Sequence, residues 1–358
     1  MKQRLYAPGP VELPPEVLAA LALPVVHHRS PAFLHLWDRV RERLAEVFRV
    51  PGQEVITLAA SGSGGLEAAL IACVPAGSKV LAINAGKFGE RWVEIARSHG
   101  HEVVELTFEW GRAADPAQLV AALEANPDVT AVLATHSETS TGVLHDVEAL
   151  ARAARSVDPG VMFLVDAVTS LASAELLPLE WQLDAVISGS QKGLLSPPGL
   201  AFVWLSERAW QLDHEQRGSF YLDLRRYRGG KTPMTPATSL VAALDVALGL
   251  LLDEGLTKVF ARRARLTELL VDGAAGLGFS QFAERPTPAV AALRVPSDVN
   301  AKSLVRNLAA QGVTIAGGQD RLADTVIRPS LLGHADELDV AVLLAALEQA
   351  LVRSRQLA

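Results

Sequence analysis

The feature that most constrains the fold is a series of short, almost wholly apolar runs separated by polar or glycine-rich loops. The stretches 65–72 and 88–98, which lie between such runs, have the spacing of amphipathic helices. Apolar runs alternating with helices are typical of a mostly parallel sheet with both faces covered, so we predict an α/β fold. Ligands of such sheets bind beyond the carboxyl ends of the strands. The runs are residues 54–60, 79–84, 101–108, 129–136, 161–167, 184–188 and 201–205.

The pattern changes near residue 239, where two long helical stretches begin. After them come short strand candidates and further helical segments, which predict a smaller C-terminal α/β domain. The sequence shows no internal repeat and no low-complexity linker, so we expect the parts to pack tightly. We divide the 358 residues into an N-terminal arm (1–14), a large domain (15–253) and a small domain (254–358).

Composition excludes several function classes. Hydrophobic residues make up 49% of the chain, and the net charge of -7 argues against nucleic-acid binding. A single cysteine, Cys73, allows no internal disulfide and no multi-cysteine metal cluster, and we predict no metal site. The N-terminus lacks the apolar core of a signal peptide, and no apolar run of about 18 residues suggests a membrane span. We therefore expect a cytoplasmic protein.

Lys192 is the one lysine in "DAVISGSQKGLLSPPGLAFVWL", a segment that joins two apolar runs. A lysine held near strand ends in apolar surroundings has its charged form disfavoured, which makes the amine available as a nucleophile. The alternative is an ordinary lysine that reaches solvent from a loop.

Other polar residues follow neighbouring apolar runs. Asp166 follows five apolar residues in the run 161–167, where it either caps a helix or pairs with a pyridinium nitrogen. The stretch "LAASGSGGLEAAL", residues 58–70, has the form of a strand, a glycine-rich turn and a helix start. The backbone N–H groups of such a helix start bind anions. Glu67 stands where a dinucleotide fingerprint needs its third glycine, so a single phosphate is the better interpretation.

Three further positions complete the pattern. Phe88 follows the run 79–84 and either stacks on a planar cofactor or packs in the core. The hydroxyls of "THSETSTG", residues 135–142, bind a ligand or build a turn. Arg328 clamps a carboxylate or lies at the surface. Together these groups describe a site for a cofactor with an aldehyde, a pyridine ring and a phosphate, which is pyridoxal 5′-phosphate.

The sequence resembles the class V aminotransferases of pyridoxal-phosphate fold type I, in particular the alanine–glyoxylate and serine–pyruvate group. The resemblance runs nearly end to end through "APGPVELPP", "SGSGGLEAAL", "NAGKFGER", "THSETSTGV", "LVDAVTSL", "SGSQKGLLSPPGLAF" and "VIRPSLLG". It implies a transaminase that moves an amino group from alanine or serine to glyoxylate or pyruvate. It also implies a homodimer with active sites at the interface.

The resemblance assigns a role to each matching residue. Lys192 would bind the cofactor aldehyde covalently and move protons, and Asp166 would pair with the ring nitrogen. Phe88 would stack on the ring and Thr139 would contact the ring-hydroxyl region. Arg328, with the backbone near Gly9, would hold the substrate carboxylate. The phosphate contacts implied are Ser63, Gly64, Gly65, Ser190 and Gln191, with Thr235 from the neighbouring subunit.

Three alternatives are weighed against the residues, and the first two have evidence against them. A desulfurase needs a cysteine on a late mobile loop, whereas Cys73 lies in an apolar helical stretch and is expected in the core. A non-catalytic scaffold would need neither Lys192 nor Asp166. Phosphoserine becomes the better donor if the cluster Arg225, Arg226 and Arg228 turns toward the site. As an ordinary basic run, the cluster would instead lie in solvent.

Overall fold

The computed structural model describes residues 2–212 and 219–356, and its centre is a seven-stranded sheet of order β2-β10-β9-β8-β5-β3-β4. Only β10 runs antiparallel to its neighbours, so the sheet is mostly parallel as predicted. Each of the seven predicted apolar runs forms one strand. The strands are β2 (Val55–Leu58), β3 (Lys79–Asn84), β4 (Glu102–Thr107), β5 (Val129–Thr135), β8 (Met162–Asp166), β9 (Ala185–Gly189) and β10 (Ala201–Leu205).

The sheet separates two hydrophobic cores, because successive side chains of a strand point to opposite faces. In β8, Phe163 and Val165 join the core that also contains α2, α5, α6 and α8, whereas Leu164 joins the core beneath α3 and α4. This arrangement confirms a sheet covered on both faces. The helices are α2 (Pro31–Val47), α3 (Gly62–Cys73), α4 (Lys87–Ser98), α5 (Pro116–Glu124), α6 (Val147–Val157) and α8 (Thr238–Glu254).

Local sequence explains how α2 begins. The Ser30 hydroxyl accepts a hydrogen bond from the Phe33 backbone N–H, and Pro31 occupies the first helical position. Both are favoured at helix starts, because the first N–H groups of a helix lack partners within it. The short α1 (Pro15–Leu21) likewise starts with proline and packs with α2 against α8. Two further short elements are α7 (Glu207–Gln211) and η1 (Leu224–Arg226).

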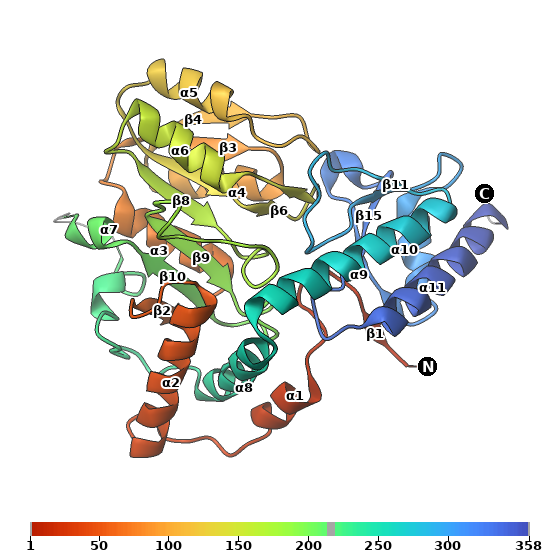
Figure 1. Ribbon diagram of the computed structural model, residues 1–358, viewed down its shortest axis with the longest axis horizontal. Coiled ribbons are helices and arrows are strands. Elements are labelled where there is room, and N and C mark those ends of the chain that lie inside the picture. The colour runs from red at the N-terminus through yellow and green to blue at the C-terminus, as the bar shows by residue number, and fades with distance from the viewer. Residues whose placement is uncertain (1, 213–218, 357–358) are drawn as a thin grey trace.

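The C-terminal part is built on a second, four-stranded antiparallel sheet of order β11-β12-β15-β14. Helix α9 (Leu256–Gly276) runs from α8 to α11 (Glu337–Gln356) and so links the two parts (Figure 1). The N-terminal arm joins the C-terminal part, since β1 (Arg4–Leu5) pairs with β13 (Val313–Thr314). The division at residue 254 stays a prediction. The other elements are β11 (Ser280–Gln281), β12 (Leu293–Arg294), α10 (Ala301–Ala309), β14 (Ala316–Gly317), η2 (Asp320–Leu322) and β15 (Val326–Arg328).

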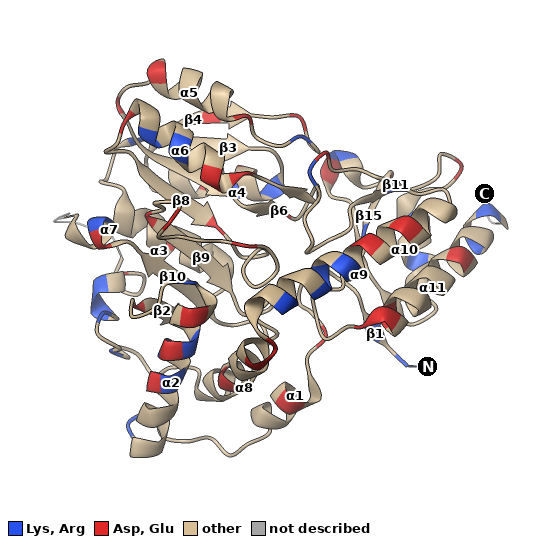
Figure 2. Ribbon diagram, viewed as in Figure 1, with Lys and Arg blue, Asp and Glu red and all other residues tan. Residues whose placement is uncertain are grey.

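Charged side chains of both signs are interspersed on the outer helices. Helices α2 and α9 each carry basic and acidic residues along their length (Figure 2). Several of these charges pair with one another, as Arg262 does with Glu254. Within residues 2–212 and 219–356, no helix has the length and apolarity that crossing a membrane requires.

Candidate active site

Lys192 lies in the turn between β9 and β10, at the carboxyl end of β9. Its side chain is 8% exposed, and its Nζ atom donates a hydrogen bond to the Pro8 carbonyl at 2.6 Å. Burial is the main cause that lowers the Lys192 pKa to about 8, and the positive charge of Arg328 acts in the same direction. More of this amine is therefore neutral near pH 8 than in an ordinary lysine.

The N-terminal arm passes directly over Lys192. An added Cβ atom on Gly9 would lie 2.5 to 2.7 Å from Cδ, Cε and Nζ of Lys192, which is closer than real contacts allow. Gly9 also has a φ of 139°, a conformation that side chains disfavour. Residue 9 is therefore glycine for two physical reasons. The structure places the predicted substrate-binding backbone against the predicted catalytic amine.

Asp166 ends β8, the strand that pairs in parallel with β9. Asp166 is 3% exposed, and within the described part of the chain its carboxylate accepts one hydrogen bond, from the Val168 N–H at 2.8 Å. Burial raises the Asp166 pKa to about 6, while that hydrogen bond and the charge of Lys192 oppose the shift. The residue closes a local turn, but one N–H leaves most of the acceptor capacity of a buried carboxylate unused.

The N-terminus of α3 lies beside the loop that follows Asp166. An added Cβ on Gly62 would meet Val168 Cγ2 at 2.7 Å, so the two segments touch. The residue before the helix, Ser61, forms no capping bond within the described part of the chain. Ser63 and Gly64 are half-buried in this first turn. Uncapped N–H groups at a helix start suit a phosphate, as predicted from the glycine-rich turn.

Two other predicted phosphate contacts differ in their surroundings. Gln191 lies close to Gly189, and its buried Oε1 atom has no hydrogen-bond partner among the described groups. Gly65 faces the sheet, where an added Cβ would lie 2.8 Å from Ile187 Cγ2. Gly65 therefore lets α3 pack closely on the strands, which is a structural role whether or not its N–H also contacts phosphate.

Thr139 and Arg328 meet on another side of the site. The Arg328 Nη1 atom donates to the Thr139 carbonyl and its Nε atom to the Gly317 carbonyl, both at 2.9 Å. Burial lowers the Arg328 pKa to about 10, so the guanidinium remains charged at neutral pH. The Thr139 hydroxyl is 2.7 Å from the hydroxyl of Thr169, three residues after Asp166. Residues from distant parts of the chain thus converge beside Asp166.

Phe88 occupies the first turn of α4 and is half-buried. The guanidinium carbon of Arg91, one turn further along, lies 4.8 Å from the centre of the Phe88 ring. No described acidic side chain forms an ion pair with Arg91. Its positive charge contributes to the pKa values of both Asp166 and Lys192, which indicates that it lies near them. Sequence patterns did not single out this arginine.

The predicted cofactor contacts of Ser190 and Thr235 are not tested by the surroundings that the structure gives them. The Ser190 hydroxyl donates to the Pro197 carbonyl and accepts from the Leu200 N–H, so it already stabilises the proline turn. A phosphate contact from Ser190 stays a prediction and would require this hydroxyl to exchange partners. Thr235 is exposed and lines a small hollow with Thr57, Tyr221 and other residues. Its predicted role concerns a neighbouring subunit, which this single chain does not test.

The arginine cluster is exposed and engaged locally. Arg225 donates to the Leu212 carbonyl, Arg226 lies over the Phe220 ring and Arg228 lies over the Trp210 ring. These contacts match the interpretation as an ordinary basic run at the surface. Cys73 is 1% exposed and lies in the core beneath α3, as expected.

Two buried charges near the site were missed by sequence reasoning. Glu138 is 1% exposed and lies within the hydroxyl-rich stretch that attracted attention only for its hydroxyls. Arg263 is also 1% exposed and donates to the Ala172 and Gly193 carbonyls, the latter directly after Lys192. Arg263 interrupts the apolar face of α9, and that interruption was the signal available. Glu138 gave none, because a lone acid among hydroxyls is ordinary loop composition.

The donors and acceptors of the site match the chemistry of pyridoxal 5′-phosphate. An amine of lowered pKa suits an aldehyde, and a buried carboxylate with unused acceptor capacity suits a protonated pyridine nitrogen. The uncapped N-terminus of α3 suits a phosphate. These three features lie together at the carboxyl ends of β8 and β9, where ligands of such sheets bind.

Comparison with known proteins identifies the family. The family model "Aminotransferase class-V" matches residues 13–343, and the chain therefore belongs to this family. The protein is a pyridoxal-phosphate-dependent aminotransferase with the α/β fold of such enzymes, as the sequence predicted.

Individual relatives cover almost the whole chain. A solved structure of an aspartate aminotransferase of subgroup IV from Thermus thermophilus has 36% identity and a TM-score of 0.91, covering 98% of this chain and 99% of its own. The alanine–glyoxylate aminotransferase of Nostoc has 31% identity and a TM-score of 0.93, with 98% and 96% covered. The "Soluble hydrogenase 42 kDa subunit" of Anabaena cylindrica is 36% identical, over 98% of this chain and 94% of that protein.

Proposed function

We propose that this aminotransferase acts in the cytoplasm and moves the amino group of alanine or serine to glyoxylate or pyruvate. The observation that carries the proposal is the placement of Arg328, the buried arginine whose charge acts on Lys192. One guanidinium offers one fork for the carboxylate that every amino acid and 2-oxo acid shares. The names of relatives support the acceptor and the donors, since they include a serine–glyoxylate aminotransferase of Methylorubrum extorquens.

Each predicted residue has a proposed part in this reaction. When bound, pyridoxal 5′-phosphate supplies an aldehyde and an electron-accepting ring. Lys192 provides the amine that attaches it and later carries a proton to and from the substrate carbon. Asp166 keeps the ring nitrogen protonated, and Phe88 covers one face of the ring. The backbone at Gly9 closes over Lys192 and excludes water from the substrate carboxylate on Arg328.

The remaining residues hold the cofactor in place. Thr139 contacts the ring-hydroxyl region, while Ser63, Gly64, Gly65, Ser190 and Gln191 hold the phosphate. We further propose a homodimer in which Thr235 reaches the cofactor of the neighbouring subunit. Two observations support it: Thr235 is exposed in a single chain, and the segment around α1 presents large apolar side chains, with Val25 78% exposed. Analytical ultracentrifugation of the holoenzyme tests the oligomeric state.

Arg91 favours aspartate as a second candidate donor. Its guanidinium lies over Phe88 without an ion-pair partner among the described residues, and a second carboxylate on the substrate would provide that partner. Relatives named for aspartate include the L-aspartate–glyoxylate aminotransferase of Paracoccus denitrificans, at 31% identity. Phosphoserine has less support, because Arg225, Arg226 and Arg228 are engaged at the surface.

A single half-reaction tests these donors against one another. The holoenzyme is mixed separately with alanine, serine, aspartate and phosphoserine, and absorbance follows conversion of the lysine-bound cofactor to its amine form. We expect alanine or serine to react fastest. A rate with aspartate or phosphoserine tenfold higher than with alanine or serine corresponds to a reaction barrier about 1.4 kcal/mol lower. That result would overturn the proposal that the donor is alanine or serine.

An Arg91→Gln variant distinguishes a donor with one carboxylate, such as alanine, from aspartate, which has two. If aspartate is the donor, this substitution lowers the aspartate rate at least tenfold and leaves the alanine rate within twofold. Equal loss with both donors would assign Arg91 to the packing of Phe88 instead. Absence of conversion with every donor would refute the proposed function itself.

A further inference from the structure

Glu138 is a carboxylate buried among hydrogen-bond donors from two distant segments. Its Oε2 atom accepts from the backbone N–H groups of Phe88 and Gly89 at 3.0 and 3.1 Å. Its Oε1 atom accepts from the backbone N–H and the hydroxyl of Ser140. These four bonds satisfy both oxygens, which is how proteins accommodate a carboxylate that is 1% exposed.

The two N–H groups belong to the first turn of α4, and Glu138 takes the part that an N-cap side chain usually plays. The residue at the N-cap position is Gly86, which has no side chain to cap the helix. The Ser140 hydroxyl accepts from the preceding N–H, that of Lys87, at 3.0 Å. Three orphan donors of α4 are thus satisfied by the 138–140 segment, and a negative charge there is favoured by the helix dipole.

Gly86 makes this approach possible. An added Cβ atom at residue 86 would lie 2.4 Å from the Ser140 hydroxyl oxygen and 2.5 Å from Glu138 Cδ. No side chain fits between the helix start and the 138–140 segment. The close contact is therefore a property of two separate stretches of sequence, "NAGKFGER" and "THSETSTG".

The same segment also carries Thr139, which bonds Arg328 and Thr169. Glu138 thereby connects the aromatic side of the pocket to the side formed by Thr139 and Arg328. We infer that Glu138 is a positioning residue, which sets the separation between the Phe88 ring and Thr139 and so fixes how the cofactor ring is held. This inference rests on the proposed function of Phe88 and Thr139.

The charge of Glu138 has a second effect on the pocket. It opposes the lowering of the Arg328 pKa and raises the Asp166 pKa further, although burial is the main cause of both shifts. Burial also raises the pKa of Glu138 itself, against its four hydrogen bonds. Replacing this carboxylate by a neutral amide should lower the Asp166 pKa, a change that mere loosening of the fold does not predict.

Two variants and one control test the inference. In Glu138→Gln the amide oxygen still accepts from Phe88 and Gly89, but the N–H and the hydroxyl of Ser140 both lose their acceptor. In Glu138→Ala all four bonds are lost. The control is Asp115→Ala, which removes an exposed carboxylate that caps α5 through the Ala117 N–H. We expect kcat to fall about tenfold for the Gln variant and about 100-fold for the Ala variant, because small misplacements at a site cost this much. The control should stay within twofold.

Two readouts do not depend on turnover. Visible circular dichroism of the bound cofactor reports how the ring is held, and hydrogen exchange reports the Phe88 and Gly89 amides in cofactor-free protein. We expect an altered dichroism band in both Glu138 variants, with faster exchange in Glu138→Ala. An unchanged band would overturn the inference. If Glu138→Ala does not fold, the dichroism band of Glu138→Gln alone tests the inference.

A double-mutant cycle identifies the route of action. If Glu138 acts through Phe88, then Glu138→Gln costs less than threefold in kcat when Phe88 is already leucine. The same tenfold loss in both backgrounds would show that Glu138 does not act through the ring. A parent enzyme that transaminates none of the donors refutes the proposed function. Hydrogen exchange and dichroism of the bound cofactor still test the positioning role of Glu138 in that case.

Discussion

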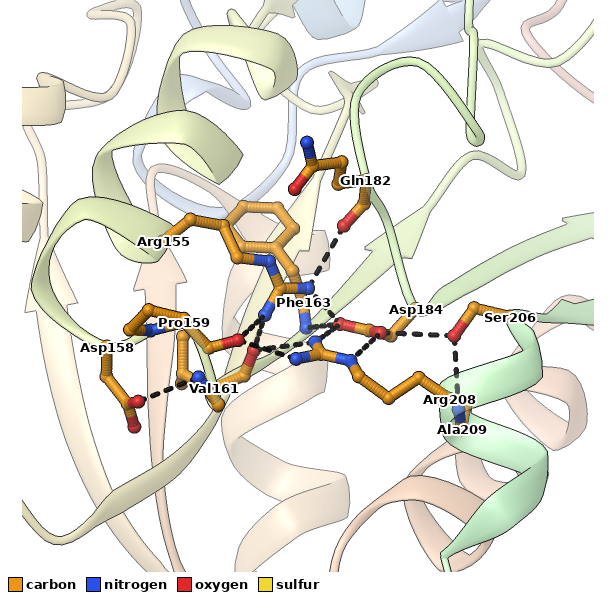
Figure 3. Close-up of polar contacts among 11 residues, drawn as sticks. Arg155, Asp158, Pro159, Val161, Phe163, Gln182, Asp184, Ser206, Arg208 and Ala209 are labelled. Atoms are coloured by element: carbon orange, nitrogen blue, oxygen red, sulfur yellow. Dashed lines mark hydrogen bonds and ion pairs between the residues drawn. The ribbon is translucent and has the colours of Figure 1, made fainter.

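Two buried carboxylates on neighbouring strands have opposite surroundings. Asp184 directly precedes β9, and it pairs with the guanidinium groups of both Arg155 and Arg208. It also accepts from the Phe163 N–H and the Ser206 hydroxyl (Figure 3). Asp166, at the end of β8 and the opposite edge of the same sheet, accepts one hydrogen bond from the residues that the structure describes. Both carboxylates are at most 3% exposed.

The difference shows how one residue type serves structure at one edge and chemistry at the other. Arg155 and Arg208 also donate to backbone carbonyls of Pro159 and Val161, so their donors are used within the protein. The surface hollow beside them, of about 570 Å³, therefore offers a ligand few free groups. At the Asp166 edge, by contrast, a buried carboxylate keeps unused acceptors. Unused hydrogen-bonding groups, rather than the volume of a surface hollow, therefore identify the site.

The largest effect on turnover is expected from Lys192→Ala. The variant should fold, because the lysine side chain bonds only the Pro8 carbonyl among the described residues. It should bind cofactor without the visible absorbance of a lysine-bound aldehyde. Loss of the nucleophile and proton carrier should lower kcat at least about 10³-fold. Absorbance spectra and steady-state rates measure both. Transamination at the parental rate would show that another residue performs the chemistry.

The next effect is expected from Asp166→Asn, which should lower kcat about 10²-fold and weaken cofactor binding. A neutral amide does not stabilise a protonated ring nitrogen, so that electrostatic contribution is lost. Single-turnover absorbance with the preferred donor measures the rate. A near-parental rate would reduce Asp166 to a turn-forming residue.

The same variant tests the raised pKa in cofactor-free protein. The folded pKa of Asp166, about 6, exceeds its ordinary value of 3.8, so the folded state binds the proton more tightly. The contribution of Asp166 to stability is therefore greatest below pH 3.8 and declines as pH rises to about 6. Asp166→Asn should remove that decline, as denaturant unfolding of both proteins between these pH values will show. A difference in stability that is independent of pH would contradict the assignment.

The smallest effect on turnover is expected from Asp184→Asn. Removing one partner of a buried ion-pair network should lower the free energy of unfolding by about 3 kcal/mol. Because Asp184 lies at the opposite edge from Lys192, kcat per folded molecule should stay within twofold. Denaturant titration and active-site-normalised rates measure the two quantities. A tenfold loss of kcat with unchanged stability would erase the distinction between the two carboxylates.

Much of the architecture was predictable because the local composition of a segment indicates whether it forms a buried strand. The seven apolar runs became the seven strands of the large sheet, and the rule that ligands bind at strand ends brought Lys192, Asp166 and Phe88 into one hypothesis. Loop contacts were less predictable. Ser190 matched a motif, yet its hydroxyl is used by the turn at Pro197. A motif gives the residue type, whereas the partner of a hydroxyl depends on the surrounding geometry.

The sequence by itself determined which segments are buried, where each strand ends and which chemical groups stand there, since all three depend on neighbours along the chain. Only the tertiary structure decided that the Pro8 carbonyl meets the Lys192 amine and that Glu138 caps the helix carrying Phe88. It also decided that the arginine cluster near η1 contacts aromatic rings at the surface. The contacts of Lys192 and Glu138 join residues 184 and 50 positions apart, and they form only where packing of the two sheets and their helices brings loops within hydrogen-bond distance.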